Sequence, residues 1–362
     1  MVNLAKTFLS LKKSEIAILK AVEQGMRRYE WVPLLDIIQM SKLQPKTAEY
    51  NLRKLAGRNL VYKTWEPYEG YQIGFFAYDI LTLADLVERD EVSSLGEVLG
   101  VGKESVVYGA LGPADGKTRT DESCEYEFEA PEPESAPKDE WVIKEDEDAK
   151  TKDNETSVGY RTSQDEPFDE VVDTCDLLAD ENLTPLAIKF HREGQTSFKH
   201  VRRVRDHLTD VPKCPWIHAA RLGARKEFRI LKLLYPGISV PRPVAINRHA
   251  VVMEHLDGVE LYKVDLTNPK ECLDIILEEV RLAWKKGIIH ADLSPYNVLI
   301  VNGEVKIIDW PQAVNRGHPE AQELLQRDLK NVVDHFRRKY HLEMTLEDAV
   351  AFVQREKEPS MR

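Results

Sequence analysis

The stretch that decides the fold is IIHADLSPYNVLIVNGEVKIIDW, residues 288–310. His290, Asp292 and Asn297 occur in it in the order H-x-D-x-x-x-x-N. Asp309 follows two short apolar segments, VLIV and VKII, which are separated by the turn NGE. This pattern is typical of a catalytic loop in which one aspartate orients or deprotonates an acceptor hydroxyl, while an asparagine and a second aspartate bind a metal ion. We therefore predict that Asp292 and Asp309 are catalytic and that Asn297 and Asp309 bind metal.

The chemistry of these ligands predicts the metal and the nucleotide. One carboxylate and one amide are hard oxygen donors, and Mg²⁺ binds such groups while keeping waters and phosphate oxygens in its other positions. The expected cofactors are therefore ATP and Mg²⁺, with Mn²⁺ able to replace the magnesium.

A glycine-containing segment lies far upstream, at LGEVLGVGKESVVYGAL (95–111). It predicts two strands joined by a turn whose backbone N–H groups can approach phosphates closely, because glycine has no Cβ. Ser105 stands where a GxGxxG loop has its third glycine, and its hydroxyl can also donate to a phosphate. Taken alone, the segment fits an ordinary tight hairpin equally well. The nucleotide-binding residues predicted here are Gly100, Val101, Gly102, Lys103, Glu104, Ser105 and Val107.

Three further segments complete the expected nucleotide site. The alternating strand TPLAIKF (184–190) presents Lys189, a point cation suited to phosphates. The helical pattern AARLGARKEFRILKLLY (219–235) supplies Glu227, which is expected to hold Lys189 in an ion pair. The apolar strand and turn VVMEHLDG (251–258) are predicted to contact adenine through the backbone. The residues assigned to that contact are Met253, Glu254, His255 and Leu256.

Residues 1–90 predict a winged helix. Helical patterns at 11–24, 33–40 and 45–56 are followed by two strands around the polar turn EPYEG. The third helix of such a domain usually enters a nucleic-acid groove, although the domain can also dock a protein or pack on its neighbour. The residues expected to contact nucleic acid, beside Asn51, are Lys46, Arg53, Lys54 and Arg58.

Charge is distributed unevenly along the rest of the chain. Residues 112–184 contain 24 acidic and 7 basic residues with few large apolar ones, which predicts a disordered, solvating insertion. By contrast, the basic stretch 189–205 is expected to form a mobile loop and short helix beside the nucleotide. It offers Thr196 or Ser197 for autophosphorylation, and phosphorylation there would oppose RNA contact. The predicted RNA contacts in this stretch are Arg202, Arg203 and Arg205.

The expected fold is α+β. A winged-helix domain (1–90) precedes a bilobal protein-kinase-like fold with an N-lobe at 91–258 and a C-lobe at 259–362. The 53 residues that follow Asp309 are too few for the activation loop, APE segment and peptide-binding helices of an ordinary protein kinase. The C-lobe is therefore predicted to be reduced.

Composition favours the cytoplasm and excludes a membrane partner. The four cysteines lie far apart without zinc-site or disulfide-scaffold spacing, and no apolar run approaches the roughly 20 residues needed to cross a bilayer. The N-terminus lacks the basic and apolar regions of a signal peptide. Nothing in the sequence indicates an oligomeric state.

Four motifs carry a family resemblance. GVGKESVVY, AIKFHREGQTSF, HADLSPYNVLI and IIDWPQAV resemble the RIO atypical protein kinases, and the N-terminal domain resembles the subfamily with a winged helix, Rio type two. Pro295 and Trp310 depart from the family pattern, which usually has an acidic residue and a phenylalanine at these positions. Neither departure removes a predicted ligand, so we expect activity to survive.

The resemblance implies a function as well as a fold. It implies an ATP-dependent serine/threonine protein kinase or ATPase that autophosphorylates, can pass a phosphoryl group to Asp309, and acts in maturation of the small ribosomal subunit. Its expected partners are the subunit precursor and its rRNA. Two alternatives remain open from the residues: a small-molecule phosphotransferase of the aminoglycoside or choline type, and a nucleic-acid-binding regulator with an inactive kinase lobe.

Overall fold

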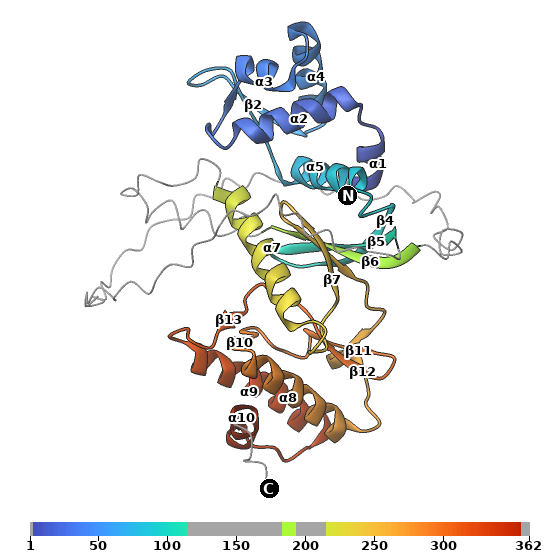
Figure 1. The fold of residues 1–362 in the computed structure, drawn as a ribbon, viewed down its shortest axis with the longest axis vertical. Coiled ribbons are helices and arrows are strands. Elements are labelled where there is room, and N and C mark those ends of the chain that lie inside the picture. The colour runs from blue at the N-terminus through green and yellow to red at the C-terminus, as the bar shows by residue number, and fades with distance from the viewer. Residues whose placement is uncertain (1–2, 114–182, 193–214, 356–362) are drawn as a thin grey trace, which may run out of the picture. The chain divides into compact units, whose positions relative to one another are not determined.

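The computed structural model describes residues 3–113, 183–192 and 215–355 of the 362-residue chain (Figure 1). Several predictions concern segments outside the described residues: the order of the acidic insertion, and the roles of Thr196, Ser197, Arg202, Arg203 and Arg205.

The N-terminal part has the three helices and the wing that the sequence predicts, together with two helices, α1 and α5, and a short strand, β1, that it does not. Its elements are α1 (Leu4–Leu9), α2 (Lys13–Gly25), β1 (Val32–Pro33), α3 (Leu34–Ser41), α4 (Pro45–Gly57), β2 (Val61–Thr64), β3 (Gly70–Ile73) and α5 (Phe75–Glu88). The strands form a sheet in the order β1-β3-β2. Pro45 begins α4, where its missing N–H costs no hydrogen bond. Gly25 ends α2 against Val32, and a Cβ there would lie 2.3 Å from the valine side chain.

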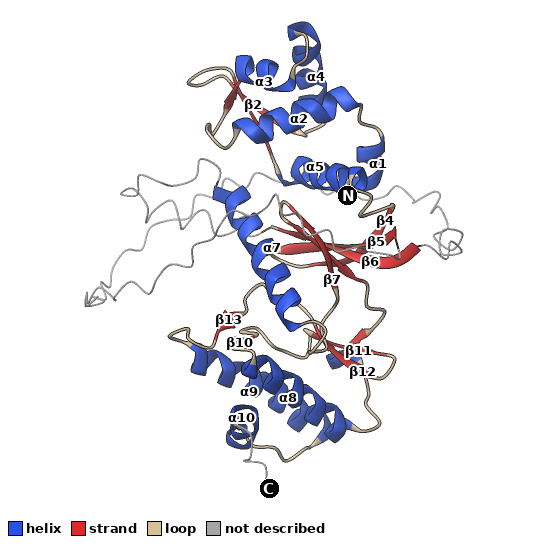
Figure 2. Cartoon of the chain, viewed as in Figure 1, coloured by secondary structure: helices blue, strands red, loops and turns tan. Residues whose placement is uncertain are grey.

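The N-lobe is a five-stranded antiparallel sheet in the order β4-β5-β6-β8-β7. Its elements are β4 (Ser94–Val101), β5 (Ser105–Pro113), β6 (Leu183–His191), β7 (Pro243–Asn247), β8 (Ala250–Glu254) and the helix α7 (Pro215–Leu234). Figure 2 shows α7 beside this sheet.

The structure corrects two predicted boundaries. Gly112 and Pro113 pair with Thr184 and Leu183, so the ends of the predicted acidic insertion belong to β5 and β6. The first three residues of the predicted mobile stretch 189–205 are likewise buried residues of β6, because the strand continues to His191. In both places, backbone pairing extends an alternating strand beyond the point where its composition changes.

The C-lobe combines short strands with three described helices. Its elements are β9 (Val259–Glu260), the 3₁₀ turn η3 (Leu261–Lys263), α8 (Pro269–Lys285), β10 (Ile288–Ile289), β11 (Val298–Val301), β12 (Glu304–Ile307), β13 (Val314–Asn315), α9 (Ala321–Tyr340) and α10 (Leu346–Gln354). Within the described ranges, no helix is long and apolar enough to span a membrane.

Two hydrophobic clusters fill the described interior. One joins α7, α8, α9 and α10 to the C-lobe strands. The other runs from the winged helix into the N-lobe, where Ile80 and Leu83 of α5 share a cluster with Ile188 and Phe190 of β6. The winged helix and the kinase sheet are therefore packed on a common core.

Candidate active site

Lys189 lies between two carboxylates. It points from β6, and its Nζ is 2.7 Å from Glu227 Oε1 on α7 and 2.5 Å from Asp309 Oδ1. Its side chain is 7% exposed. Burial opposes its charge, but the two carboxylates outweigh burial and raise the pKa of Lys189. The structure thus joins three predicted residues that are far apart in the sequence.

Glu227 is the hub of this arrangement. Its Oε1 also accepts the Trp310 N–H at 3.1 Å, and its Oε2 lies 2.8 Å from His191 Nε2. Burial alone would raise the pKa of Glu227, yet the Lys189 charge and the His191 contact lower it to about 2. Because the carboxylate is ionised and its Oε1 accepts from both Lys189 and the Trp310 N–H, it fixes the direction of the lysine side chain.

The catalytic loop is connected to Asp309 through His290. The Asp292 N–H donates to His290 Nδ1 at 3.3 Å, so the ring proton is on Nε2, which donates to the Ile308 carbonyl at 3.0 Å. Burial lowers the pKa of His290, which keeps the ring neutral. His290 therefore links the backbone of Asp292 to the residue that precedes Asp309.

Each predicted metal ligand keeps one side-chain oxygen for a cation, because Lys189 contacts only Oδ1 of Asp309. Asn297 Nδ2 donates to the Asp292 carbonyl at 2.8 Å, which leaves Asn297 Oδ1 for a cation. The Asp309 side chain is 41% exposed on a backbone with φ of +68°, and Ala291 has φ of +65°. Non-glycine residues in this region cluster at functional sites. One amide and one carboxylate oxygen, beside the Lys189 ammonium, fit Mg²⁺ with ATP.

The glycine segment forms the turn between β4 and β5. The Gly102 N–H donates to the Ser105 carbonyl at 2.8 Å, and the Arg192 N–H donates to the Glu104 carbonyl at 2.7 Å. A Cβ at Gly100 would meet nothing within 4 Å, so space is open above the strand. Gly100 to Glu104 are partly or fully exposed. Val107, in β5, pairs opposite Lys189.

Known proteins share both parts of the chain. Residues 8–89 match the family described as Rio2, N-terminal, and residues 175–349 match the RIO domain. The RIO-type serine/threonine-protein kinase Rio2 of Methanocaldococcus jannaschii is 32% identical over 320 residues, which cover 86% of this chain and 92% of the relative. The chain belongs to the RIO-type serine/threonine-protein kinases. The family resemblance of the sequence is thereby confirmed.

Other RIO kinases agree in sequence and fold. The serine/threonine-protein kinase rio2 of Schizosaccharomyces pombe is 28% identical over 345 residues, covering 94% of this chain and 80% of the relative. The crystal structure of the Rio2 kinase-ADP/Mg²⁺-phosphoaspartate complex from Chaetomium thermophilum superposes with a TM-score of 0.68 at 24% identity. It covers 97% of this chain and 89% of that one. The predicted α+β fold is confirmed.

In this RIO kinase, α9 holds the catalytic loop. Asp328 accepts the N–H groups of Ala291 and Leu293 at 2.7 and 2.9 Å. Arg327 donates to the Ala291 carbonyl, and Asn331 donates to that of Leu293 at 3.0 Å. Burial raises the pKa of Asp328 to about 6, although the two N–H donors favour its ionised form. These residues were not predicted from the sequence, where the signal was an acidic residue on the apolar face of 321–340.

The Trp310 side chain is buried, hydrogen-bonded and packed against His290. It is 1% exposed, its Nε1–H donates to the Ile307 carbonyl at 3.1 Å, and its ring lies 4.5 Å from that of His290. Pro295 is also buried in the catalytic loop. The two departures from the family pattern therefore lie in packed positions and leave the ligand oxygens of Asn297 and Asp309 untouched.

In the predicted adenine-binding segment, some backbone N–H groups are already hydrogen-bonded within the N-lobe. Met253 is buried, the Glu254 N–H donates to the Arg242 carbonyl at 2.9 Å, and the His255 N–H donates to the Pro185 carbonyl at 3.3 Å. The N–H groups of Glu254 and His255 are therefore already paired. The backbone groups of this segment that remain for an adenine are the Leu256 N–H and the carbonyl oxygens.

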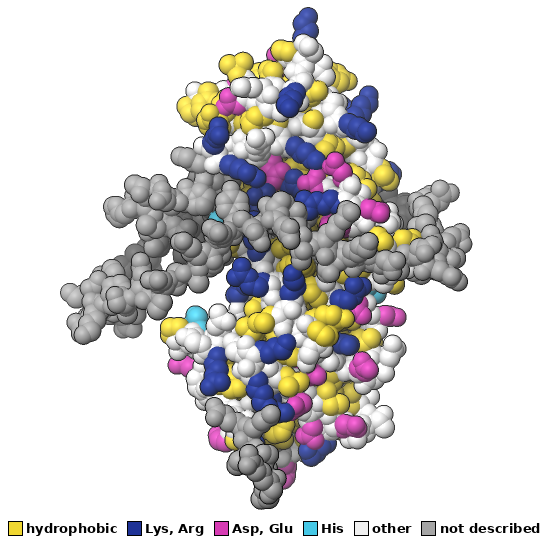
Figure 3. Space-filling model, viewed as in Figure 1, with side chains coloured by type: hydrophobic (Ala, Val, Ile, Leu, Met, Phe, Trp, Pro, Cys, Tyr) yellow, Lys and Arg dark blue, Asp and Glu magenta, His cyan; other side chains and the backbone are white. Residues whose placement is uncertain are grey.

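The predicted nucleic-acid contacts on α4 divide into two groups. Lys46 and Arg53 are exposed. Lys54 instead pairs with the buried Glu15 at 2.9 Å, and Arg58 donates to Ser10 Oγ. Asn51, expected beside them on the surface, is buried. On the face drawn in Figure 3, basic side chains of the N-terminal part are interspersed with hydrophobic and polar ones.

Proposed function

We propose that this RIO kinase binds ATP with Mg²⁺ and transfers the terminal phosphoryl group to a serine or threonine hydroxyl, to Asp309, or to water. The observation that carries the proposal is Lys189, whose Nζ lies 2.7 Å from Glu227 and 2.5 Å from Asp309. Glu227 can retain the lysine while Asp309 releases it to a phosphate, since Asp309 is the more exposed carboxylate. A Lys–Glu pair beside a metal-binding aspartate is the arrangement that phosphoryl transfer requires.

Each polar side chain has a role in the proposed reaction. Asn297 Oδ1 and the Asp309 carboxylate would hold Mg²⁺, which neutralises charge on the transferring phosphates when bound. Asp292 accepts the proton of the attacking hydroxyl as the new O–P bond forms and the bond to the ADP oxygen breaks. His290 holds the backbone of Asp292 in place, because its ring bridges the Asp292 N–H and the Ile308 carbonyl.

We also propose that the kinase acts in the cytoplasm on the precursor of the small ribosomal subunit, with its rRNA as partner, and that it autophosphorylates at Thr196 or Ser197. Support comes from the family resemblance and from the exposed Lys46 and Arg53 on α4. Cations at these positions can contact a phosphate backbone.

Phosphoryl transfer by Asp292→Ala and Asp309→Asn tests the catalytic assignment. We expect each to lose on the order of 10²-fold or more of the turnover rate. Asp292→Ala should change the melting temperature little, because Asp292 is exposed, whereas Asp309→Asn should also lower it, because it removes one of the two carboxylates that face the buried Lys189. Asp274→Asn is the control, since Asp274 forms an exposed pair with Lys270. Wild-type turnover by both variants would refute the catalytic assignment. Turnover stimulated by an aminoglycoside, and not by a pre-ribosomal particle, would favour the small-molecule alternative.

A further inference from the structure

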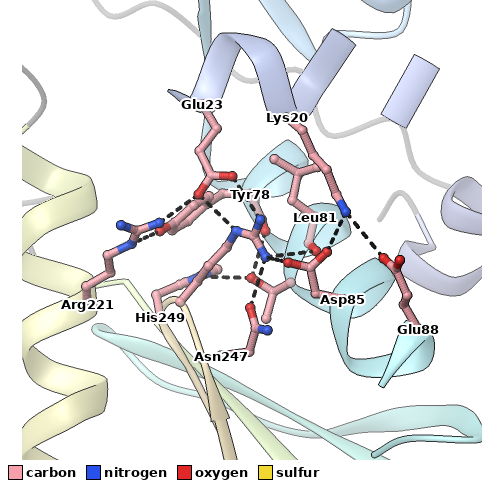
Figure 4. A network of polar contacts seen from close by, with 11 residues as sticks. Lys20, Glu23, Tyr78, Leu81, Asp85, Glu88, Arg221, Asn247 and His249 are labelled. Carbon is pink, nitrogen blue, oxygen red and sulfur yellow. Dashed lines mark hydrogen bonds and ion pairs between the residues drawn. The ribbon is translucent and has the colours of Figure 1, made fainter. Parts of the chain in front are cut away.

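A polar network ties the winged helix to the kinase N-lobe (Figure 4). Glu23 of α2 pairs with Arg221 at 2.7 Å and with Arg248 at 2.9 Å. Asp85 of α5 pairs with Arg248 at 2.5 Å and with Lys20 at 2.8 Å. These pairs connect the winged helix to α7 and to the turn between β7 and β8, and Arg221 also donates to the Tyr78 hydroxyl of α5.

Asp79, on the same helix as Asp85, reaches further into the kinase lobe. Its side chain is completely buried. Oδ1 lies 2.8 Å from His249 Nε2, and Oδ2 accepts from the Arg192 guanidinium. His249 stacks on Tyr78 with ring centroids 4.4 Å apart. A buried carboxylate with two partners is costly to leave unpaired, so this contact is a strong constraint on both partners.

Arg192 carries the constraint to the glycine turn. It directly follows β6, and its backbone N–H donates to the Glu104 carbonyl at 2.7 Å. Glu104 lies inside the turn closed by the bond from Gly102 N–H to the Ser105 carbonyl. The guanidinium that Asp79 holds and the N–H that fixes the turn therefore belong to one residue.

His249 adds a second connection to the same strand end. Its carbonyl accepts the His191 N–H at 2.8 Å, and His191 Nε2 lies 2.8 Å from Glu227. Asp79 is thus connected to His191, the last residue of β6, and to Arg192, which follows it. Tightly packed interiors transmit displacements of this kind because they deform little.

We propose that Asp79 of the winged helix is a positioning residue for the nucleotide site: it fixes Arg192, and through Arg192 the glycine turn at 102–105. The inference rests on the proposed function, because the turn binds phosphates only if the chain binds ATP. Replacing the carboxylate by an amide keeps the shape but removes the charge that holds the guanidinium. Arg192 then no longer holds the Glu104 carbonyl, and the turn loses its order before the nucleotide arrives.

Asp85→Asn is a matched control. Asp85 lies six residues from Asp79 on α5, faces the same interface and also pairs with an arginine. The side chains of its partners Lys20 and Arg248 contact Glu23, Leu81, Glu88 and Asn247 but no residue of β6 or of the glycine turn. Both variants lose an ion pair between the winged helix and the lobe, so both are expected to lower the melting temperature. Only the Asp79 variant should alter nucleotide binding.

The experiment measures MgATP binding by calorimetry on full-length wild type, Asp79→Asn, Asp85→Asn, Arg192→Gln and the Asp79/Arg192 double variant. We expect Asp79→Asn to raise the Kd of MgATP roughly tenfold, or about 1.4 kcal/mol, and Asp85→Asn to stay within about twofold. Arg192→Gln should match Asp79→Asn, and the double variant should bind no more weakly than either, because both act on one connection. Amide exchange at Arg192 should be faster in Asp79→Asn, with or without nucleotide.

The outcomes separate this inference from the proposed function. If wild type does not bind MgATP, the proposed function fails and this inference with it. If wild type binds and Asp79→Asn binds equally well, or loses no more than Asp85→Asn, Asp79 has only a structural role. Should Asp79→Asn fail to fold, Arg192→Gln decides by itself, since its side chain is 19% exposed at the edge of the interface. Unchanged binding by Arg192→Gln would overturn the inference.

Discussion

Replacement of Glu227 by glutamine tests the central ion pair of the active site. Glu227 is 1% exposed and holds Lys189, the Trp310 N–H and His191. Its pKa falls from 4.5 to about 2 in the folded chain, which corresponds to about 3 kcal/mol of stabilisation. Glutamine keeps the shape but leaves the buried lysine with one carboxylate. We therefore expect Glu227→Gln to lower the free energy of unfolding by about 3 kcal/mol and the melting temperature by roughly 4–5 °C.

The pH dependence of this effect distinguishes charge from packing. Because the folded pKa of Glu227 is lowered, its stabilisation is complete above pH 4.5 and is lost as the pH falls towards 2. Melting temperatures of wild type and Glu227→Gln should thus differ most near neutral pH and converge in acid. Glu260→Gln is the control, since Glu260 and Lys263 form an exposed pair that contributes little. Equal losses in the two variants, or a difference that does not change with pH, would refute the reasoning.

Three further predictions follow from named contacts. Asp328→Asn should lower kcat by about tenfold or more and leave the Kd of MgATP unchanged, because an amide cannot accept both loop N–H groups on its two side-chain atoms; unchanged steady-state kinetics would refute it. Trp310→Phe should cost about 1–3 kcal/mol in thermal unfolding, since the Ile307 carbonyl loses its indole donor, and an unaltered melting temperature would contradict this. Lys46→Gln and Arg53→Gln should each reduce the slope of log affinity for RNA against log salt by about 0.7–0.9, whereas Lys54→Gln should not, because Lys54 pairs with Glu15.

The sequence was sufficient for the elements that depend on local pattern. The three helices of the winged domain, the wing, the strand carrying Lys189 and the turn NGE all have periodicity or turn residues that local rules detect. The Lys189–Glu227 proximity could be predicted only because the order of motifs matches a known fold. No local rule joins residues 38 positions apart on a strand and a helix.

What the sequence did not predict depends on tertiary contacts. Asn51 and Lys54 lie on a helix whose polar face looks exposed, but α2 packs on α4 and brings Glu15 to Lys54. In the sequence, Asp328 cannot be distinguished from an ordinary acidic residue of a helix. Its role is visible only in the structure, where α9 packs against the catalytic loop and Asp328 accepts the Ala291 N–H. Charged residues are mostly exposed, so a buried one is recognised only when its partners are known.

The alternation of β6 explains why the winged helix cannot be treated as a separable module. Successive side chains of a strand point to opposite faces, so Ile188 and Phe190 face one way and Lys189 the other. Ile188 and Phe190 are fully buried in the cluster that includes α5, whereas Lys189 faces Glu227. Each of the two apolar side chains contributes roughly 1.5–3 kcal/mol when buried. Deleting the winged helix would uncover the back of the strand that carries Lys189, so nucleic-acid binding is better tested with surface charges such as Lys46 than by truncation.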